Sequence, residues 1–151
     1  MLLSLSIFGP IASALLYFYF GRLIGKRTDY LMLALYGISV ISCLILLTTT
    51  ITNDIVIIFS FTKLSTVLGL NLELASTNLS QIVLTVIILV SNCVNCYAIY
   101  YMSADAFSNK FIGLLSAFTF SMSLLAISSN IVSLFIFWEL IGLFSFLLIG
   151  F

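Results

Sequence analysis

The acidic residue Glu139 is the side chain whose type and position suggest chemistry most strongly. It lies nine residues into the apolar run Ile131 to Phe151, whereas the other nine charged residues lie in polar segments or near the ends of apolar runs. If the run is a membrane helix, a rise of about 1.5 Å per residue places this carboxyl near mid-membrane. A charged acid there costs roughly 2.5 to 3.5 kcal/mol, and such residues usually serve ion or proton pathways. Because a carboxyl can bind and release a proton, Glu139 is a candidate proton relay.

A structural role is the alternative for Glu139, as a neutral carboxyl that joins helices by a hydrogen bond. Such a bond between membrane helices is worth about 1 kcal/mol. Gly142, one turn further on, leaves room beside the carboxyl for a neighbouring helix or a water molecule. No Lys or Arg lies within any of the apolar runs. A cationic partner at the depth of Glu139 is therefore expected from another chain.

Small polar residues recur at helical spacing on two other apolar runs. They are Ser116, Thr119 and Ser123 on the fourth run, and Asn92 and Asn95, with Thr85 and Cys96, on the third. Residues three or four apart share a helix face, so both sets could border a hydrated path toward Glu139. Packing between membrane helices is the alternative, because Ser, Thr and Asn are common at such interfaces.

Metal and redox chemistry find little support in the sequence. There is no His, the commonest metal ligand, and the three Cys residues lie in apolar runs. Cys93 and Cys96 form a C-x-x-C pair, but a structural zinc site needs four ligands. We therefore predict no metal ion, and interpret the cysteines as small, buried packing residues.

The composition indicates that lipid is the solvent of this chain. Of its 151 residues 63% are hydrophobic and 7% are charged, whereas a soluble domain carries about 25% charged residues. The net charge is zero, so no basic surface is available to bind nucleic acid. We predict an all-α integral membrane protein with a single membrane domain, residues 1–151, in contact with lipid.

Five apolar runs are long enough to cross a bilayer, which takes about 20 mostly apolar residues. They cover approximately residues 2–20, 30–51, 81–101, 111–127 and 131–151. The polar segment 52–80 is predicted to be an extramembrane loop, in which Ile55 to Phe61 favours a short strand or hairpin at the membrane surface. The N-terminus lacks the basic region and the cleavage site of a signal peptide, and is interpreted as the first span.

The basic residues predict the orientation of the chain. The loops after the first and third runs share a side and hold Arg22, Lys26, Arg27 and Lys110, whereas the other side holds Lys63 alone. Loops on the cytoplasmic or matrix side carry the excess of Lys and Arg. The N-terminus is therefore expected outside and the C-terminus on the matrix side.

The helix that contains Glu139 resembles a known family. Residues 130–150 are similar to the fifth transmembrane helix of subunit 5 of mitochondrial NADH dehydrogenase, which typically reads N-L-x-x-L-F-x-x-W-E-x-V-G-x-x-S-F-L-L-I; the pair Trp138-Glu139 is the specific part. Tyr97 to Asp105 is similar to the family's Y-S-x-x-Y-M-x-x-D, and residues 111–120 to its R-F-x-x-x-L-x-x-F-T-F. The resemblance runs from about residue 8 to the end, and is thin from residue 53 to 80.

This resemblance implies an antiporter-like subunit at the distal end of the membrane arm of respiratory complex I, in the mitochondrial inner membrane. It implies no redox cofactor in this chain, because NADH, FMN, iron–sulfur clusters and ubiquinone are handled by other subunits. In the family the acid that matches Glu139 is coupled to a Lys on a later, broken helix, and protonation of the pair is linked to proton translocation.

That later helix would lie past Phe151, as would the family's central relay and its long lateral helix. The chain is therefore interpreted as the N-terminal piece of such a subunit, with three leading helices and the first two of an inverted repeat. A companion chain that supplies the Lys is expected among the other membrane-arm subunits.

Two other functions are compatible with the sequence. Multisubunit Na+/H+ antiporters have a related large subunit whose fifth helix can read F-W-E-L, as Phe137 to Leu140 does here; this would place the chain in a bacterial cytoplasmic membrane. Alternatively, the chain is a non-catalytic scaffold that stabilises an assembly. Ile141-Gly142 and the Y-M-x-x-D loop favour complex I over the antiporters.

Overall fold

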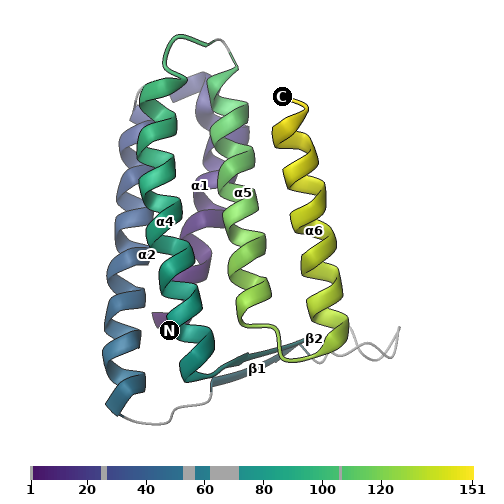
Figure 1. Cartoon of the computed structure of the whole chain (residues 1–151). Helices are drawn as coiled ribbons and strands as arrows, with labels where there is room; N and C mark the ends of the chain where they lie inside the picture. Colours follow the sequence, from purple (N-terminus) through teal and green to yellow (C-terminus); the bar gives the residue numbers. More distant parts are fainter. Residues whose placement is uncertain (1, 25–26, 53–56, 62–71, 106) are drawn as a thin grey trace.

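The computed structural model describes residues 2–24, 27–52, 57–61, 72–105 and 107–151, which form a bundle of antiparallel helices with a small hairpin at one end (Figure 1). The helices are α1 (Leu2–Ile24), α2 (Arg27–Thr52), α4 (Asn78–Tyr101), α5 (Ser108–Ala126) and α6 (Ile131–Ile149). The strands are β1 (Ile57–Phe61) and β2 (Leu72–Ser76). The predicted all-helical membrane fold is confirmed.

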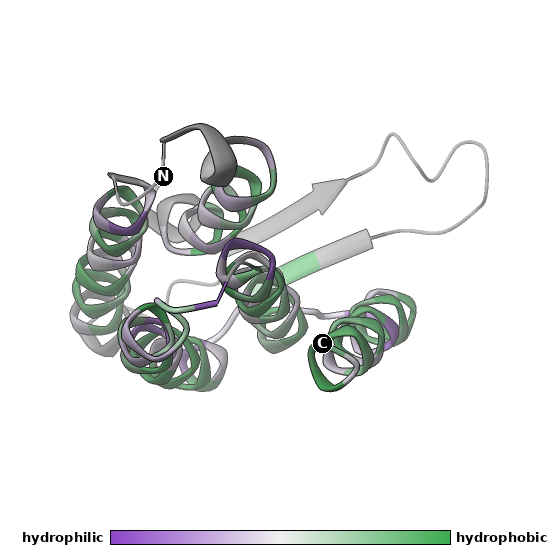
Figure 2. Cartoon of the chain, turned by 90° about the horizontal axis from the view of Figure 1, so that it is seen from above, coloured by the Kyte–Doolittle hydropathy of each residue, from purple (hydrophilic) through white to green (hydrophobic). Residues whose placement is uncertain are grey.

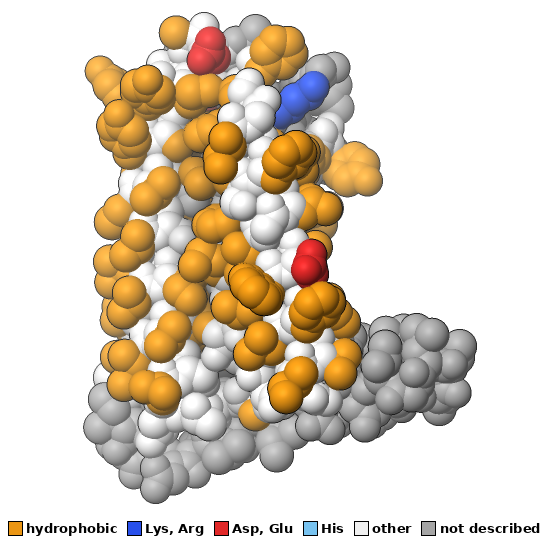
Figure 3. Space-filling model, turned by 45° about the vertical axis from the view of Figure 1, so that its right-hand side comes forward, with side chains coloured by type: hydrophobic (Ala, Val, Ile, Leu, Met, Phe, Trp, Pro, Cys, Tyr) orange, Lys and Arg blue, Asp and Glu red, His pale blue; other side chains and the backbone are white. Residues whose placement is uncertain are grey.

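Four helical segments have the length and composition to cross a membrane. They are Thr28–Thr48, Asn78–Tyr101, Ser108–Ala126 and Ile131–Ile149, of 19 to 24 residues each. A shorter apolar segment, Ser6–Tyr19, lies within α1, which is 23 residues long in all. Large hydrophobic side chains cover much of the outer surface of the bundle (Figure 3), as contact with lipid requires.

The helices are arranged as a closed group of four with a fifth at its side (Figure 2). Around the group, α1 packs on α2, α2 on α4, α4 on α5, and α5 on α1. The fifth helix, α6, packs mainly on α5 and makes a smaller contact with β2. The short connection between Ala126 and Ile131 accounts for the antiparallel pairing of α5 and α6.

The hairpin lies within the segment predicted to be an extramembrane loop. Its strands pair antiparallel, with Phe59 opposite Leu74. On its other edge β2 bonds to the connection between α5 and α6, where the Ala75 N–H donates to the Ile127 carbonyl oxygen at 2.9 Å. Lys63, together with the rest of residues 53–56 and 62–71 of this segment, lies outside the described residues.

Side-chain caps define where two helices begin. The Thr77 hydroxyl accepts from the Ser80 N–H at 3.2 Å, and the Ser80 hydroxyl accepts from the Thr77 N–H at 2.8 Å, which satisfies two donors at the start of α4. Asn130, with extended backbone, precedes α6 in the same arrangement with Ser133. The polar break at Ser128 to Asn130 thus ends one helix and starts the next.

Two apolar clusters fill the group of four helices. One contains Tyr17, Met32, Tyr36 and Ile112, and the other Ile7, Cys43, Leu46, Leu84, Ile88 and Ile127. Cys43 is buried, as expected of a packing residue. The same expectation is wrong for Cys93 and Cys96, which are exposed because they lie on the outward face of α4.

Candidate functional site

Glu139 is the ninth of the 19 residues of α6, and its side chain is exposed on the surface of the described chain. The Asn130–Ser133 cap at one end and Gly150 at the other hold the helix over the whole of this run. Among the described residues no hydrogen bond or ion pair involves its carboxylate. Figure 3 shows an acidic side chain surrounded by hydrophobic ones, well away from both ends of the bundle. The carboxylate therefore has open access on one side of α6.

The whole helix face around Glu139 is uncovered. Phe135, Leu143 and Phe146 share this face and are 55%, 52% and 74% exposed. Beside them, a Cβ atom added at Gly142 would meet nothing within 4 Å. The buried side chains of α6 are Ser133 and Phe137. We define Phe135, Glu139, Gly142, Leu143 and Phe146 as the Glu139 face.

The small polar residues predicted on the fourth run lie inside the group of four helices. Ser116, Thr119 and Ser123 of α5 are each at most 1% exposed. Their hydroxyl groups donate to carbonyl oxygens of α5 itself, at Ile112, Leu115 and Thr119, over 2.9 to 3.0 Å. The three residues share one buried face of α5, as predicted. Glu139 lies on an exposed face of α6, so within the described chain these hydroxyl groups do not adjoin its carboxyl.

The polar residues predicted on the third run are divided between two environments. Asn95 is fully buried, and its Nδ2 donates to the Ser91 carbonyl oxygen at 2.9 Å. Asn92 is half-buried and lies 4.0 Å from the sulfur of Cys96, which is exposed. Asn95 lies near Ser116 and Thr119 of α5, whereas Thr85 is 8% exposed and its hydroxyl donates to the Gln81 carbonyl oxygen at 2.7 Å.

The buried polar side chains of α4 and α5 meet at the hydroxyl of Tyr36 on α2, a residue that the sequence analysis does not single out. Its hydroxyl lies among the side chains of Ser13, Asn95, Ser116 and Thr119, which come from α1, α4 and α5. Tyr36 and Asn95 are 0% exposed. We call these five residues the polar centre. One signal in the sequence could have found it, because Tyr36 is the only one of seven tyrosines far from the end of an apolar run.

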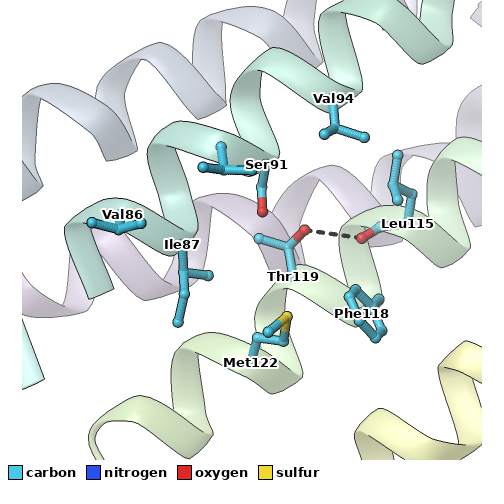
Figure 4. Close-up of a pocket in the computed structure, with 9 residues that line it drawn as sticks. Val86, Ile87, Ser91, Val94, Leu115, Phe118, Thr119 and Met122 are labelled. Atoms are coloured by element: carbon cyan, nitrogen blue, oxygen red, sulfur yellow. Dashed lines mark hydrogen bonds between the residues drawn. The ribbon is translucent and has the colours of Figure 1, made fainter. Parts of the chain in front are cut away.

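A groove of about 290 Å³ runs between α4 and α5 (Figure 4). Its walls are apolar side chains such as Val86, Val90, Leu115 and Phe118, while Ser91 and Thr119 supply the polar atoms. Glu139 does not line this groove. Within the described part of the chain no three His, Cys, Asp or Glu residues cluster as metal ligands would. The arrangement therefore offers one carboxyl for proton exchange and a separate, buried group of neutral polar side chains.

Comparison with known proteins relates the chain to one family. The family model described as NADH-ubiquinone oxidoreductase (complex I), chain 5 N-terminus, matches residues 61–112. This match reaches into the segment before residue 80, where the resemblance seen in the sequence is thin.

Individual relatives extend the similarity over the rest of the chain. NADH-ubiquinone oxidoreductase chain 5 of Phytophthora infestans is 32% identical over 152 residues, which cover 99% of this chain and 22% of the relative. NADH-quinone oxidoreductase subunit L of Campylobacter jejuni is 42% identical over 83 residues, 55% of this chain and 14% of the relative. Chain 5 of Acanthamoeba castellanii is 43% identical over 84 residues, 56% of this chain and 12% of the relative. The chain thus spans less than a quarter of the length of these relatives. By this similarity the sequence of the chain corresponds to the N-terminal part of complex I chain 5.

Proposed function

We propose that this chain is part of the distal proton-pumping, antiporter-like subunit of NADH:ubiquinone oxidoreductase, and that Glu139 is the mid-membrane carboxyl of its proton-translocation site. The position of Glu139 is the observation that carries the proposal. It is the ninth residue of a 19-residue apolar helix and lies on an exposed face of that helix. A carboxylate that faced hydrocarbon at this depth would cost roughly 2.5 to 3.5 kcal/mol. The Glu139 face is therefore covered in the working protein by something that can share a charge or a proton.

The partner of Glu139 is a basic side chain outside these helices. The apolar runs contain no Lys or Arg, and the described Lys110 lies at the start of α5 with its Nζ 5.3 Å from the centre of the Phe107 ring. The partner belongs either to further sequence of the same subunit or to a companion chain, within an assembly of membrane-arm subunits. Gly142 supports this arrangement, because it leaves space next to the carboxyl.

The chemical contribution of the chain is proton exchange and not electron transfer. In this proposal NADH, FMN, the iron–sulfur clusters and ubiquinone are handled by other subunits. The chain resides in the mitochondrial inner membrane with its C-terminus on the matrix side. The excess of basic residues in the loops after the first and third apolar runs supports that orientation.

Replacement of the carboxyl by an amide of equal size tests the role of Glu139. Glu139→Gln keeps the volume and the polarity of the side chain but cannot exchange a proton. We expect the assembled complex to translocate fewer protons per NADH oxidised, while Glu139→Asp, which keeps a carboxyl, retains more of the coupling. Both variants are first compared on native gels, so that only complexes with normal subunit content are assayed.

Two results would overturn the proposal. Unchanged proton pumping in a fully assembled Glu139→Gln complex would leave the chain with a scaffold role. Migration of the unmodified chain in a small assembly without NADH-oxidising activity would favour a cation/proton antiporter instead.

A further inference from the structure

The polar centre contains two buried polar atoms that no described residue satisfies. The Tyr36 hydroxyl oxygen and the Asn95 Oδ1 atom are both inaccessible, and neither makes a hydrogen bond of normal length and angle to a described residue. A buried polar atom left without a partner costs about 1 to 3 kcal/mol. In lipid this matters more, since no bulk solvent can reach the atoms from outside the bundle.

The hydroxyl hydrogens of the neighbouring side chains are already in use, and so is one of the two amide hydrogens of Asn95. The Ser13, Ser116 and Thr119 hydroxyls donate to the carbonyl oxygens of Pro10, Ile112 and Leu115, at 2.7, 2.9 and 3.0 Å. The Asn95 amide donates to the Ser91 carbonyl oxygen at 2.9 Å. These bonds leave oxygen atoms that can only accept, whereas the Tyr36 O–H is the one hydroxyl hydrogen of the polar centre without an acceptor.

We propose that the polar centre is a binding site for an ordered water molecule that links Tyr36 to Asn95. A water molecule has two donors and two acceptor positions, which matches this inventory. It accepts the Tyr36 O–H, donates one hydrogen to Asn95 Oδ1, and donates the other to a hydroxyl oxygen of Ser116 or Thr119. Buried waters in proteins typically make about three such bonds. A bound metal cation fits less well, because the five residues of the polar centre include no carboxylate to balance its charge.

The position of this site gives the water a structural role. Its ligands come from α2, α4 and α5, and Ser13 adds a contact from α1. One water molecule thus connects side chains of these helices inside the bundle. Thr119 also lines the groove between α4 and α5, where it faces Ser91 (Figure 4), so the site lies directly behind the wall of that groove.

X-ray hydroxyl-radical footprinting of the assembled complex tests the site. Radicals form from water, so a buried side chain is oxidised only where a bound water lies against it, and a scavenger in the buffer does not prevent this local reaction. We expect Tyr36 to be oxidised although it is 0% exposed. Tyr17 is the matched control, because it is 2% exposed and its hydroxyl has a direct protein partner in Asp29.

A second variant separates a bound water from general loosening of the bundle. Asn95→Leu removes one ligand of the water and fills the space with an apolar group, so oxidation of Tyr36 should be lost while assembly on native gels stays normal. If this variant does not assemble, Ser116→Ala replaces it and should lower the oxidation of Tyr36. Oxidation of Tyr36 no greater than that of Tyr17 would overturn the proposal. So would a high-resolution map in which the Tyr36 hydroxyl bonds directly to Asn95, Ser116 or Thr119 with no density between them.

Discussion

The Tyr17 hydroxyl donates a hydrogen bond of 2.6 Å to the Asp29 Oδ1 atom, which joins α1 to α2. Asp29 lies in the first turn of α2, where a negative charge is favoured by the free N–H groups of the helix start. Tyr17 is 2% exposed, and Gly113 of α5 packs closely on it, with only 3.3 Å between an added Cβ and the Tyr17 Cβ atom. Three helices therefore depend on this one side chain.

Tyr17→Phe should destabilise the bundle, because it removes a hydrogen bond to a charged group without changing the packing. Such a bond contributes about 1.5 to 3 kcal/mol. The expected result is a lower temperature at which the chain is lost from the native assembly. Tyr19→Phe is the control, since Tyr19 is 73% exposed. Equal stability of the two variants would show that the Tyr17–Asp29 bond contributes nothing.

Gly9→Ala should push α1 away from α2. An added Cβ would lie 1.8 Å from the Ser39 Oγ atom and 3.1 Å from the Leu35 carbonyl oxygen. Overpacking of this kind costs about 1 to 3 kcal/mol, which thermal loss from the assembly would report. Gly37→Ala is the control, because nothing lies within 4 Å of its added Cβ.

A double substitution shows whether the contact between Gly9 and Ser39 is the cause. Ser39→Ala removes the nearest atom, so it should recover part of the stability lost in Gly9→Ala. Additive effects of the two substitutions would point to a different cause.

Gly142→Leu should prevent other subunits from covering the Glu139 face while leaving the chain itself folded. Within the chain the space beside Gly142 is open, so a large side chain causes no internal clash. We expect less of the chain in the high-mass band of a native gel and an unchanged amount in the membrane. Gly142→Ala, which adds one methyl group, should have a much smaller effect. Normal assembly of the Leu variant would mean that nothing packs at this position.

Thr77→Ala should weaken the start of α4, because it removes the hydroxyl that accepts the Ser80 N–H at 3.2 Å. Loss of such a cap costs about 0.5 to 2 kcal/mol. Faster hydrogen exchange at the first amides of α4 is the measurement, and Thr77→Ser, which keeps the acceptor, should behave like the unmodified chain. Identical exchange in both variants would argue against the cap.

The sequence predicts the helices of this protein well, and their burial poorly. Apolar runs mark membrane helices because every backbone polar group must be bonded within the helix in lipid. The helices also continue into polar residues, so that α2 begins at Arg27 and not at Tyr30. Which side of each helix is buried is harder to predict, because a helix in lipid is apolar on all sides and its inner face carries no separate hydrophobic signal.

The small polar residues show this difficulty directly. Asn95 and Cys96 are neighbours in the sequence, yet Asn95 is buried and Cys96 is exposed, because successive helix positions are about 100° apart. Tyr36 gathers polar side chains from other helices, and no local spacing in the sequence describes such a meeting. The exposure of Glu139 likewise depends on where α6 packs against α5, which is a property of the whole bundle.

The bond between Ala75 and Ile127 has a mechanical consequence. Because α6 packs mainly on α5 among the described helices, its tilt is set by the interface with α5 and by the short turn before Ile131. That turn is joined to β2 at Ala75 and again where Leu74 pairs with Ser128. The hairpin and the start of α6 are therefore coupled, so a displacement of β2 would be transmitted through the turn to the helix that carries Glu139.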